Sequence, residues 1–312
     1  MPMQQPAGFE EFWNEVGEEL SGVPVAPEVE PIPMRTTDFA DMYGVRITSV
    51  GPYRLFGYLS IPRGARSASG KRTFPAIYYA PKNGSVLETI PQGTSVFIRE
   101  RYVTFSIACR GMRNSDKPYA AMYPGQLTDG LESLRSYVYR GIAADAVRGL
   151  DFLVSRPEVD KTKIVAWGND IALLAAALHS GATHVVATPS YLFDTLEMAS
   201  TTSSYPLEEF NDYLRLHPDR SDEVAAILGH FNLRWHAPAI TAETLLLADH
   251  ESGIYSPGAL ADLANGIAGK VTVHESERSS FKDGLFTEKW LTEKLIGKGA
   301  EPIVPEHWQS YV

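Results

Sequence analysis

The chain has 312 residues, of which 44% are hydrophobic, so it is long enough to bury one large core. Its formal net charge of −10, without a basic cluster, argues against nucleic acid and anionic membranes as partners. The single cysteine, Cys109, excludes an intramolecular disulfide and is typical of a reducing compartment. No apolar run approaches the roughly 20 residues of a membrane span, and residues 1–7 lack the pattern of a signal peptide. We therefore expect a cytoplasmic protein.

The first third of the chain predicts a helix, a linker and a hairpin. Helical spacing places four apolar side chains on one side of the first helix: Phe9, Phe12, Trp13 and Val16. A proline-rich linker follows over residues 23–34. Residues 45–62 then alternate like a pair of antiparallel strands, with Gly51 and Pro52 at the turn.

The remainder alternates between short apolar runs and helical patterns. We predict strands over residues 74–80, 102–108, 163–167, 244–248 and 271–274, and helices over 141–154, 171–179 and 257–267. This order favours one α/β domain with a mostly parallel sheet covered on both faces. Residues 1–34 form an N-terminal extension of it, and residues 189–238 are predicted to be a helical lid insertion.

The stretch from Ile164 to Ala172 carries most of the functional argument. Ile-Val-Ala-Trp-Gly-Asn-Asp-Ile-Ala reads as a buried strand, a tight turn and the start of an Ala/Leu-rich helix. That is the frame of a nucleophile elbow, in which a sharp turn exposes one side chain above the sheet. The exposed position usually carries serine, whereas here the frame predicts Asp170.

Several segments, in chain order, resemble the acetyl xylan esterase/cephalosporin C deacetylase family. Phe9-Glu-Glu-Phe-Trp-Asn-Glu is similar to its opening Phe-Asp-Glu-Phe-Trp-Asp helix, and Arg110-Gly-Met to its Arg-Gly-Gln. Tyr137-Val-Tyr-Arg-Gly-Ile-Ala-Ala-Asp-Ala-Val-Arg and Pro157-Glu-Val-Asp resemble two further landmarks. The resemblance covers nearly the whole chain. It implies an α/β-hydrolase fold, acyl-ester substrates and often a closed oligomer, whereas function has to be argued from the site.

This chain differs from the family at the positions of the family's catalytic residues. When the chain is aligned with the family's motifs, Asp170 occupies the position of the catalytic serine. Ser252 occupies the position of the acid, and Ser279 that of the histidine. Met112 replaces the glutamine after Arg-Gly, and Pro81-Lys82-Asn83-Gly84 replaces the oxyanion motif His-Gly-Tyr-Gly. The usual deacetylation mechanism is therefore unavailable on this alignment. Arg110, Asp145 and Arg148 are expected to be structural.

Asp170 leaves three interpretations open. It is ionised at neutral pH and could attack an alkyl carbon, although release of the covalent ester needs an activated water. As a general base it could instead remove a proton next to a carbonyl, so that an acyloxy group leaves. The third interpretation is that it merely caps the following helix.

The remaining candidate residues are expected to have supporting roles. His274 is the rival catalytic histidine, although a strand-end residue packed under the last helix is favoured; His250 follows another late strand. Lys82 could stabilise an enolate, and Asn83 could hydrogen-bond a carbonyl. Met112, Ser252 and Ser279 complete the predicted oxyanion or substrate-binding set.

We favour a carbon–oxygen lyase that eliminates acetate from an acylated small molecule, by analogy with natural-product enzymes, because the chain keeps a base but loses the hydrolytic triad. The alternatives are a hydrolase of esterase, dehalogenase or epoxide-hydrolase type that uses Asp170 with His274, and a non-catalytic relative that binds a ligand or partner subunit. No metal-ligand cluster or nucleotide motif implies a cofactor or a metal.

Overall fold

A nine-stranded, mostly parallel sheet forms the centre of the computed structural model, which describes residues 4–66, 72–81, 87–90, 94–115 and 121–311. The strand order is β1-β2-β3-β5-β4-β6-β7-β8-β9. The strands are β1 (Glu28–Pro31), β2 (Ala40–Ser49), β3 (Tyr53–Pro62), β4 (Phe74–Tyr79), β5 (Val103–Ala108), β6 (Val159–Gly168), β7 (His184–Ala187), β8 (Glu243–Ala248) and β9 (Val271–Glu275). The predicted α/β architecture with a mostly parallel central sheet is confirmed by this arrangement.

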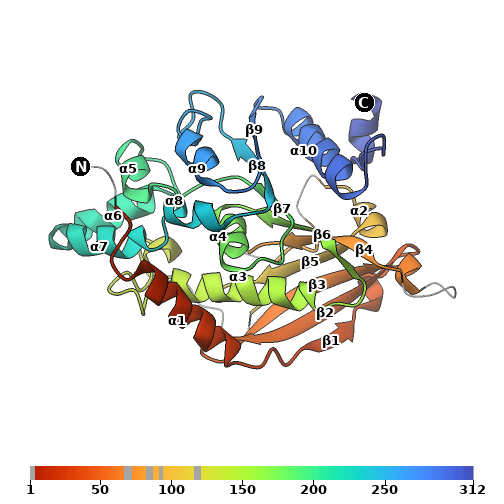
Figure 1. Cartoon of the computed structure of the whole chain (residues 1–312), viewed down its shortest axis with the longest axis horizontal. Coiled ribbons are helices and arrows are strands. Elements are labelled where there is room, and N and C mark those ends of the chain that lie inside the picture. Colours follow the sequence, from red (N-terminus) through yellow and green to blue (C-terminus); the bar gives the residue numbers. More distant parts are fainter. Residues whose placement is uncertain (1–3, 67–71, 82–86, 91–93, 116–120, 312) are drawn as a thin grey trace.

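Helices cover both faces of the sheet (Figure 1). They are α1 (Phe9–Ser21), α2 (Ile98–Arg101), α3 (Val138–Val154), α4 (Asp170–Leu178), α5 (Thr195–Ser200), α6 (Glu208–Leu216), α7 (Ser221–Gly229), α8 (Leu233–His236), α9 (Ala261–Gly266) and α10 (Ser280–Leu295). Alternate strand residues face opposite cores. Ala76 and Ala166 pack with α3 and α4, whereas Ile77 and Val165 pack with α2 and α10. None of the helices in the described ranges has the length and apolar character needed to cross a bilayer.

The N-terminal elements follow the sequence pattern closely. β2 and β3 pair antiparallel, with Ala40 opposite Pro62 and Ser49 opposite Tyr53, and Gly51 adopts φ 87° at their turn. Helix α1 buries Phe9 and Trp13 and lies beside α3 in Figure 1. The predicted hairpin is therefore present and begins five residues earlier than the alternation indicated.

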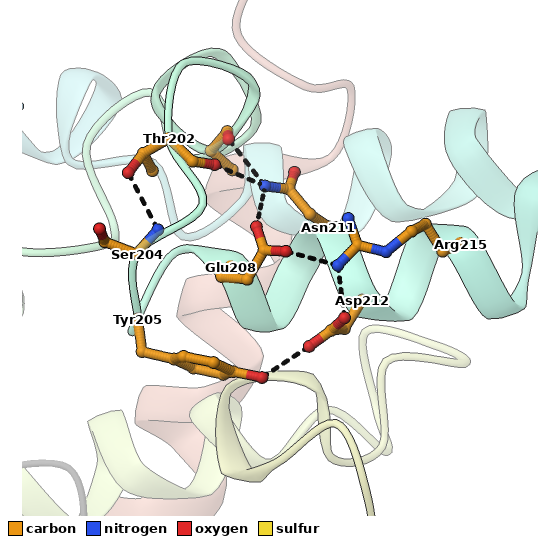
Figure 2. A network of polar contacts seen from close by, with 8 residues as sticks. Thr202, Ser204, Tyr205, Glu208, Asn211, Asp212 and Arg215 are labelled. Carbon is orange, nitrogen blue, oxygen red and sulfur yellow. Dashed lines mark hydrogen bonds and ion pairs between the residues drawn. The ribbon is translucent and has the colours of Figure 1, made fainter.

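Four helices, α5 to α8, are inserted between β7 and β8. Figure 1 shows them gathered at one end of the molecule, away from α10. Figure 2 shows how Arg215 of α6 joins the carboxylates of Glu208 and Asp212, while the Tyr205 hydroxyl donates to Asp212 Oδ2 at 2.6 Å. These contacts fasten the turn before α6 to the helix itself.

The buried His236 of α8, which packs against α1, predicts that the folded protein loses stability in acid. His236 is 3% exposed, its ring lies 4.9 Å from that of Phe9 and 5.1 Å from that of Trp13, and Nε2 is 3.0 Å from the His230 carbonyl oxygen. Burial lowers the pKa of His236 to about 4. The unfolded chain therefore takes up a proton first, near pH 6.5, so stability is complete above that pH and is lost as the pH falls towards 4. We expect this residue alone to remove about 3 kcal/mol over that window.

Urea unfolding of the wild type and His236→Gln at pH 7.5 and 4.5 measures this contribution. The wild type should lose about 2–3 kcal/mol more than the variant between the two pH values. The exposed His217 supplies the matched control, because His217→Gln should keep the wild-type pH dependence. Parallel pH profiles for the wild type and His236→Gln would contradict the prediction.

Candidate active site

The carboxyl ends of four parallel strands, β4, β6, β7 and β8, meet at one edge of the sheet. In open α/β sheets, ligands bind in the crevice outside these ends. The chain leaves β6 at Gly168, turns at Asn169 and enters α4 at Asp170. The predicted strand–turn–helix frame is therefore present at this edge, and it is the place at which the candidate residues have to be compared.

Asp170 does not face open space. The residue is 0% exposed, and its carboxylate accepts three backbone N–H groups, from Ser190 at 2.9 Å, Tyr191 at 3.3 Å and Leu192 at 2.9 Å. Burial raises the pKa of Asp170, and the three N–H donors act against that rise. This geometry matches neither the nucleophile nor the general base expected from the elbow frame. It makes Asp170 an anchor for the loop after β7.

Asn169 is the half-buried residue at the turn itself. Its Oδ1 accepts the Ile171 N–H at 3.1 Å, and its Nδ2 donates to the Tyr191 hydroxyl at 3.3 Å. Asn169 therefore caps α4, which is the role that sequence reasoning offered for Asp170. The signal was available in the sequence, because asparagine is a favoured N-cap residue one position before an Ala/Leu-rich helix.

His274 lies away from the elbow. It stands in the edge strand β9, which β7 and β8 separate from β6. Its Nε2 lies 2.9 Å from Asp283 Oδ1, and its ring stacks on Phe286 with centroids 4.0 Å apart. The packed strand-end position matches this geometry, and a pairing of His274 with Asp170 does not.

The contact between Asp283 and His274 also holds the loop after β9. Asp283 accepts the Ser276 hydroxyl at 2.8 Å and the Glu277 N–H at 2.9 Å. We expect Asp283→Asn to lower the free energy of unfolding by about 1–2 kcal/mol, because an amide cannot accept from all three donors. Urea unfolding at pH 7 measures this, with the exposed Asp219→Asn as control. A change in stability no larger than that of the control would show that the loop does not depend on Asp283.

The two loops that carry Ser252 and Ser279 are brought together. Ser252 is exposed after β8, and its Oγ accepts a hydrogen bond from the Arg278 guanidinium and lies 3.5 Å from Nδ1 of His250. Ser279 caps α10 by accepting the Lys282 N–H at 3.3 Å. The contact between Arg278 and Ser252 joins these two loops, and it was not predicted from the sequence.

Of the remaining predicted site residues, the structure describes Met112. Met112 is 5% exposed, and its backbone N–H donates to the Cys109 carbonyl at 3.2 Å, so it does not present a free oxyanion donor. Lys82 and Asn83 lie outside the described residues. Arg110 forms the expected structural ion pair: its Nη2 donates to Asp145 Oδ1 at 2.8 Å and its Nε to Asp145 Oδ2 at 2.9 Å. In the described part of the chain, no group of three His, Cys, Asp or Glu side chains could hold a metal ion.

The model of the acetyl xylan esterase (AXE1) family matches residues 2–274. The chain belongs to this family. Acetyl esterase Axe7A of Xylanibacter ruminicola is 24% identical over 205 residues, which are 61% of this chain and 45% of that protein. The chain thus spans less than half the length of that relative.

Two solved structures share the fold. The acetyl xylan esterase from Paenibacillus sp. R4 superimposes with a TM-score of 0.79 at 20% identity, covering 95% of this chain and 97% of that one. Acetyl xylan esterase 1 from Thermoanaerobacterium sp. JW/SL YS485 gives a TM-score of 0.73 at 20% identity, covering 86% and 87%.

The family corrects the reaction expected from the sequence. The prediction of a carbon–oxygen lyase that eliminates acetate is wrong, because the family and its relatives are esterases, which are hydrolases. The associated assignment to natural-product biosynthesis has no support in these relatives. The lyase inference rested on the missing triad, and a missing triad removes one mechanism without establishing another.

Proposed function

We propose that this chain hydrolyses acyl esters of small molecules, adding water across the ester bond to give a carboxylic acid and an alcohol. The observation that carries the proposal is the family match over residues 2–274. The likeness in fold to two acetyl xylan esterases supports it. Acetyl is therefore the acyl group to test first.

The proposed nucleophile is Ser252, because Asp170 is enclosed by its three N–H partners. A serine hydrolase needs a base within reach of the hydroxyl, and contacts of this kind are commonly longer without substrate. Ser252 Oγ lies 3.5 Å from Nδ1 of His250, which is half-buried in the same loop. Arg278, which donates to that Oγ, supplies a positive charge next to the attacking oxygen.

In the proposed reaction, Ser252 Oγ attacks the acyl carbon and its proton passes to His250 Nδ1. The imidazolium returns the proton to the departing alkoxide, which leaves as the alcohol. Water then attacks the acyl-serine, giving up a proton to His250, and the carboxylic acid leaves as the Ser252 hydroxyl is restored. All atoms come from the ester and one water molecule.

The test is release of acetate in ¹⁸O-labelled water from p-nitrophenyl acetate and from an acetylated xylo-oligosaccharide. Mass spectrometry should find one ¹⁸O in the acetate, and Ser252→Ala should lower kcat by about 100-fold or more. The exposed Ser200→Ala on α5 is the control and should act as the wild type. Unchanged activity in Ser252→Ala would reject Ser252 as nucleophile while leaving the hydrolase. No acetate from the wild type with either ester would reject the hydrolase itself.

The second candidate is a member of the family that binds an acyl ester without cleaving it. The observation in its favour is that Asp170 anchors a loop and Ser279 caps α10, so that two of the family's three catalytic positions are occupied by structural groups. Saturation-transfer NMR with the same esters distinguishes the two functions. Binding without acetate release would favour this second candidate.

A further inference from the structure

A cavity of about 370 Å³ lies between α10 and the last residues of the chain. Figure 1 shows the C-terminal segment folded back beside α10, and the Phe281 and Trp308 rings lie 5.5 Å apart. Trp167 of β6 and Leu247 of β8 form the floor. These two side chains belong to the core that α10 covers, on the face of the sheet opposite α4. Asp170, His250 and Ser252 are not among the described residues that line the cavity.

One ionisable group in the cavity wall is strongly buried. Glu288 of α10 is 6% exposed, and its Oε1 accepts the Ile303 N–H at 3.2 Å and the Thr292 hydroxyl at 3.4 Å. Within the described part of the chain, no hydrogen-bond partner reaches Oε2. Oε2 is not fully enclosed by protein atoms and opens onto the cavity. A carboxylate oxygen that faces a cavity without a donor favours a ligand that supplies positive charge.

The charges around Glu288 leave the cavity acidic. Asp283 lines the same wall, and none of the described lining residues is lysine or arginine. Arg101 of α2 is the nearby cation whose charge acts on Glu288, and its Nη1 donates a hydrogen bond to the Glu301 carbonyl at 2.7 Å. Burial nevertheless raises the pKa of Glu288 to about 7.

Two indole rings complete the site. Trp167 and Trp308 both line the cavity, and the face of an indole attracts a cation as well as apolar groups. A volume of about 370 Å³ falls within the range of small-molecule sites. An anion would face Asp283 and Glu288 together, and a neutral molecule would leave the Glu288 carboxylate without a counter-charge. The wall therefore fits an organic cation.

We propose that this cavity binds a small organic cation, a protonated or quaternary amine, with its charge beside Glu288 and its apolar part against Trp167 and Trp308. The bound cation stabilises the ionised form of Glu288, so binding at neutral pH releases a proton from the protein. This proposal does not depend on the proposed ester hydrolysis. Cation binding can be measured without any turnover of an ester.

Choline and its uncharged isostere 3,3-dimethylbutan-1-ol are suitable probes, since they differ in charge and hardly in shape. Isothermal titration calorimetry at pH 8 should show one choline site per chain, with the isostere binding at least tenfold more weakly. Glu288→Gln should weaken choline binding at least tenfold. Glu293→Gln, an exposed carboxylate of the same helix, should leave binding unchanged.

The pH dependence provides a second readout. The groups that face Glu288 or share its cavity are Tyr79 of β4, Arg101 of α2, Tyr102, Asp283 and His307. Protonation of Glu288 in acid removes the negative charge that attracts the cation. Choline should bind at least tenfold more tightly at pH 8 than at pH 5.5. Equal binding of the two probes, unchanged binding in Glu288→Gln, or no choline site at all would overturn the proposal.

Discussion

Asp170→Ala is expected to lower the free energy of unfolding by about 3–5 kcal/mol, because it leaves three N–H groups without their acceptor. Two of these N–H groups are in buried residues, since Tyr191 is 2% exposed and Leu192 is 0% exposed. An unpaired buried donor costs about 1–3 kcal/mol. Asp170→Asn should cost less, about 2–3 kcal/mol, since one amide oxygen still accepts while the amide NH₂ faces other donors.

Urea unfolding at pH 7 measures both losses, and Asp219→Ala, which removes an exposed carboxylate, is the control. The same variants test whether Asp170 is catalytic. If the change acts through the loop after β7, the variants should lose stability, with amide hydrogens of residues 190–192 exchanging faster. A variant that keeps the stability of the wild type while losing all activity would reject the anchoring role and restore Asp170 as a reacting group.

The position of Asp170 was predictable from the sequence, but the direction of its side chain was not. The motif fixes the strand, the turn and the helix because these depend on neighbouring residues. The side chain is directed by residues 190–192, which follow β7. That strand, His184–Ala187, is only four residues long and was not predicted from the sequence. Without β7, no loop could be placed next to the carboxylate, and the elbow frame alone favoured exposure.

The same distinction holds for the other candidate residues. The sheet order separates His274 from β6 by two strands, and this order follows from tertiary pairing rather than from local pattern. Glu288 was not identified at all, because on the sequence it is one of several acidic residues in an amphipathic helix. In the folded chain the C-terminal segment lies beside α10, and the Ile303 N–H donates to the Glu288 carboxylate.

Glu288→Gln is expected to stabilise the protein above pH 7, which is the reverse of the usual effect of changing a buried residue. Burial raises the pKa of Glu288 to about 7 from an ordinary value of 4.5. The folded chain therefore keeps a proton that the unfolded chain has released, so stability falls as the pH rises from 4.5 to 7. Above pH 7 this lowers stability by about 3 kcal/mol. Glutamine keeps an oxygen for the Ile303 and Thr292 donors and avoids the buried charge.

Unfolding in urea at pH 4.5 and pH 8 isolates this contribution, because other titrating groups, His236 among them, are shared by the wild type and the variant. Relative to the wild type, Glu288→Gln should gain about 2–3 kcal/mol between the two pH values, whereas the exposed Glu293→Gln should gain nothing. Saturating choline at pH 8 should narrow the difference, since a bound cation stabilises the ionised wild type and not the variant. A pH-independent difference between Glu288→Gln and the wild type would mean that the carboxylate is hydrated in the folded protein. Glu288 would then have no unmet charge with which to attract a cation.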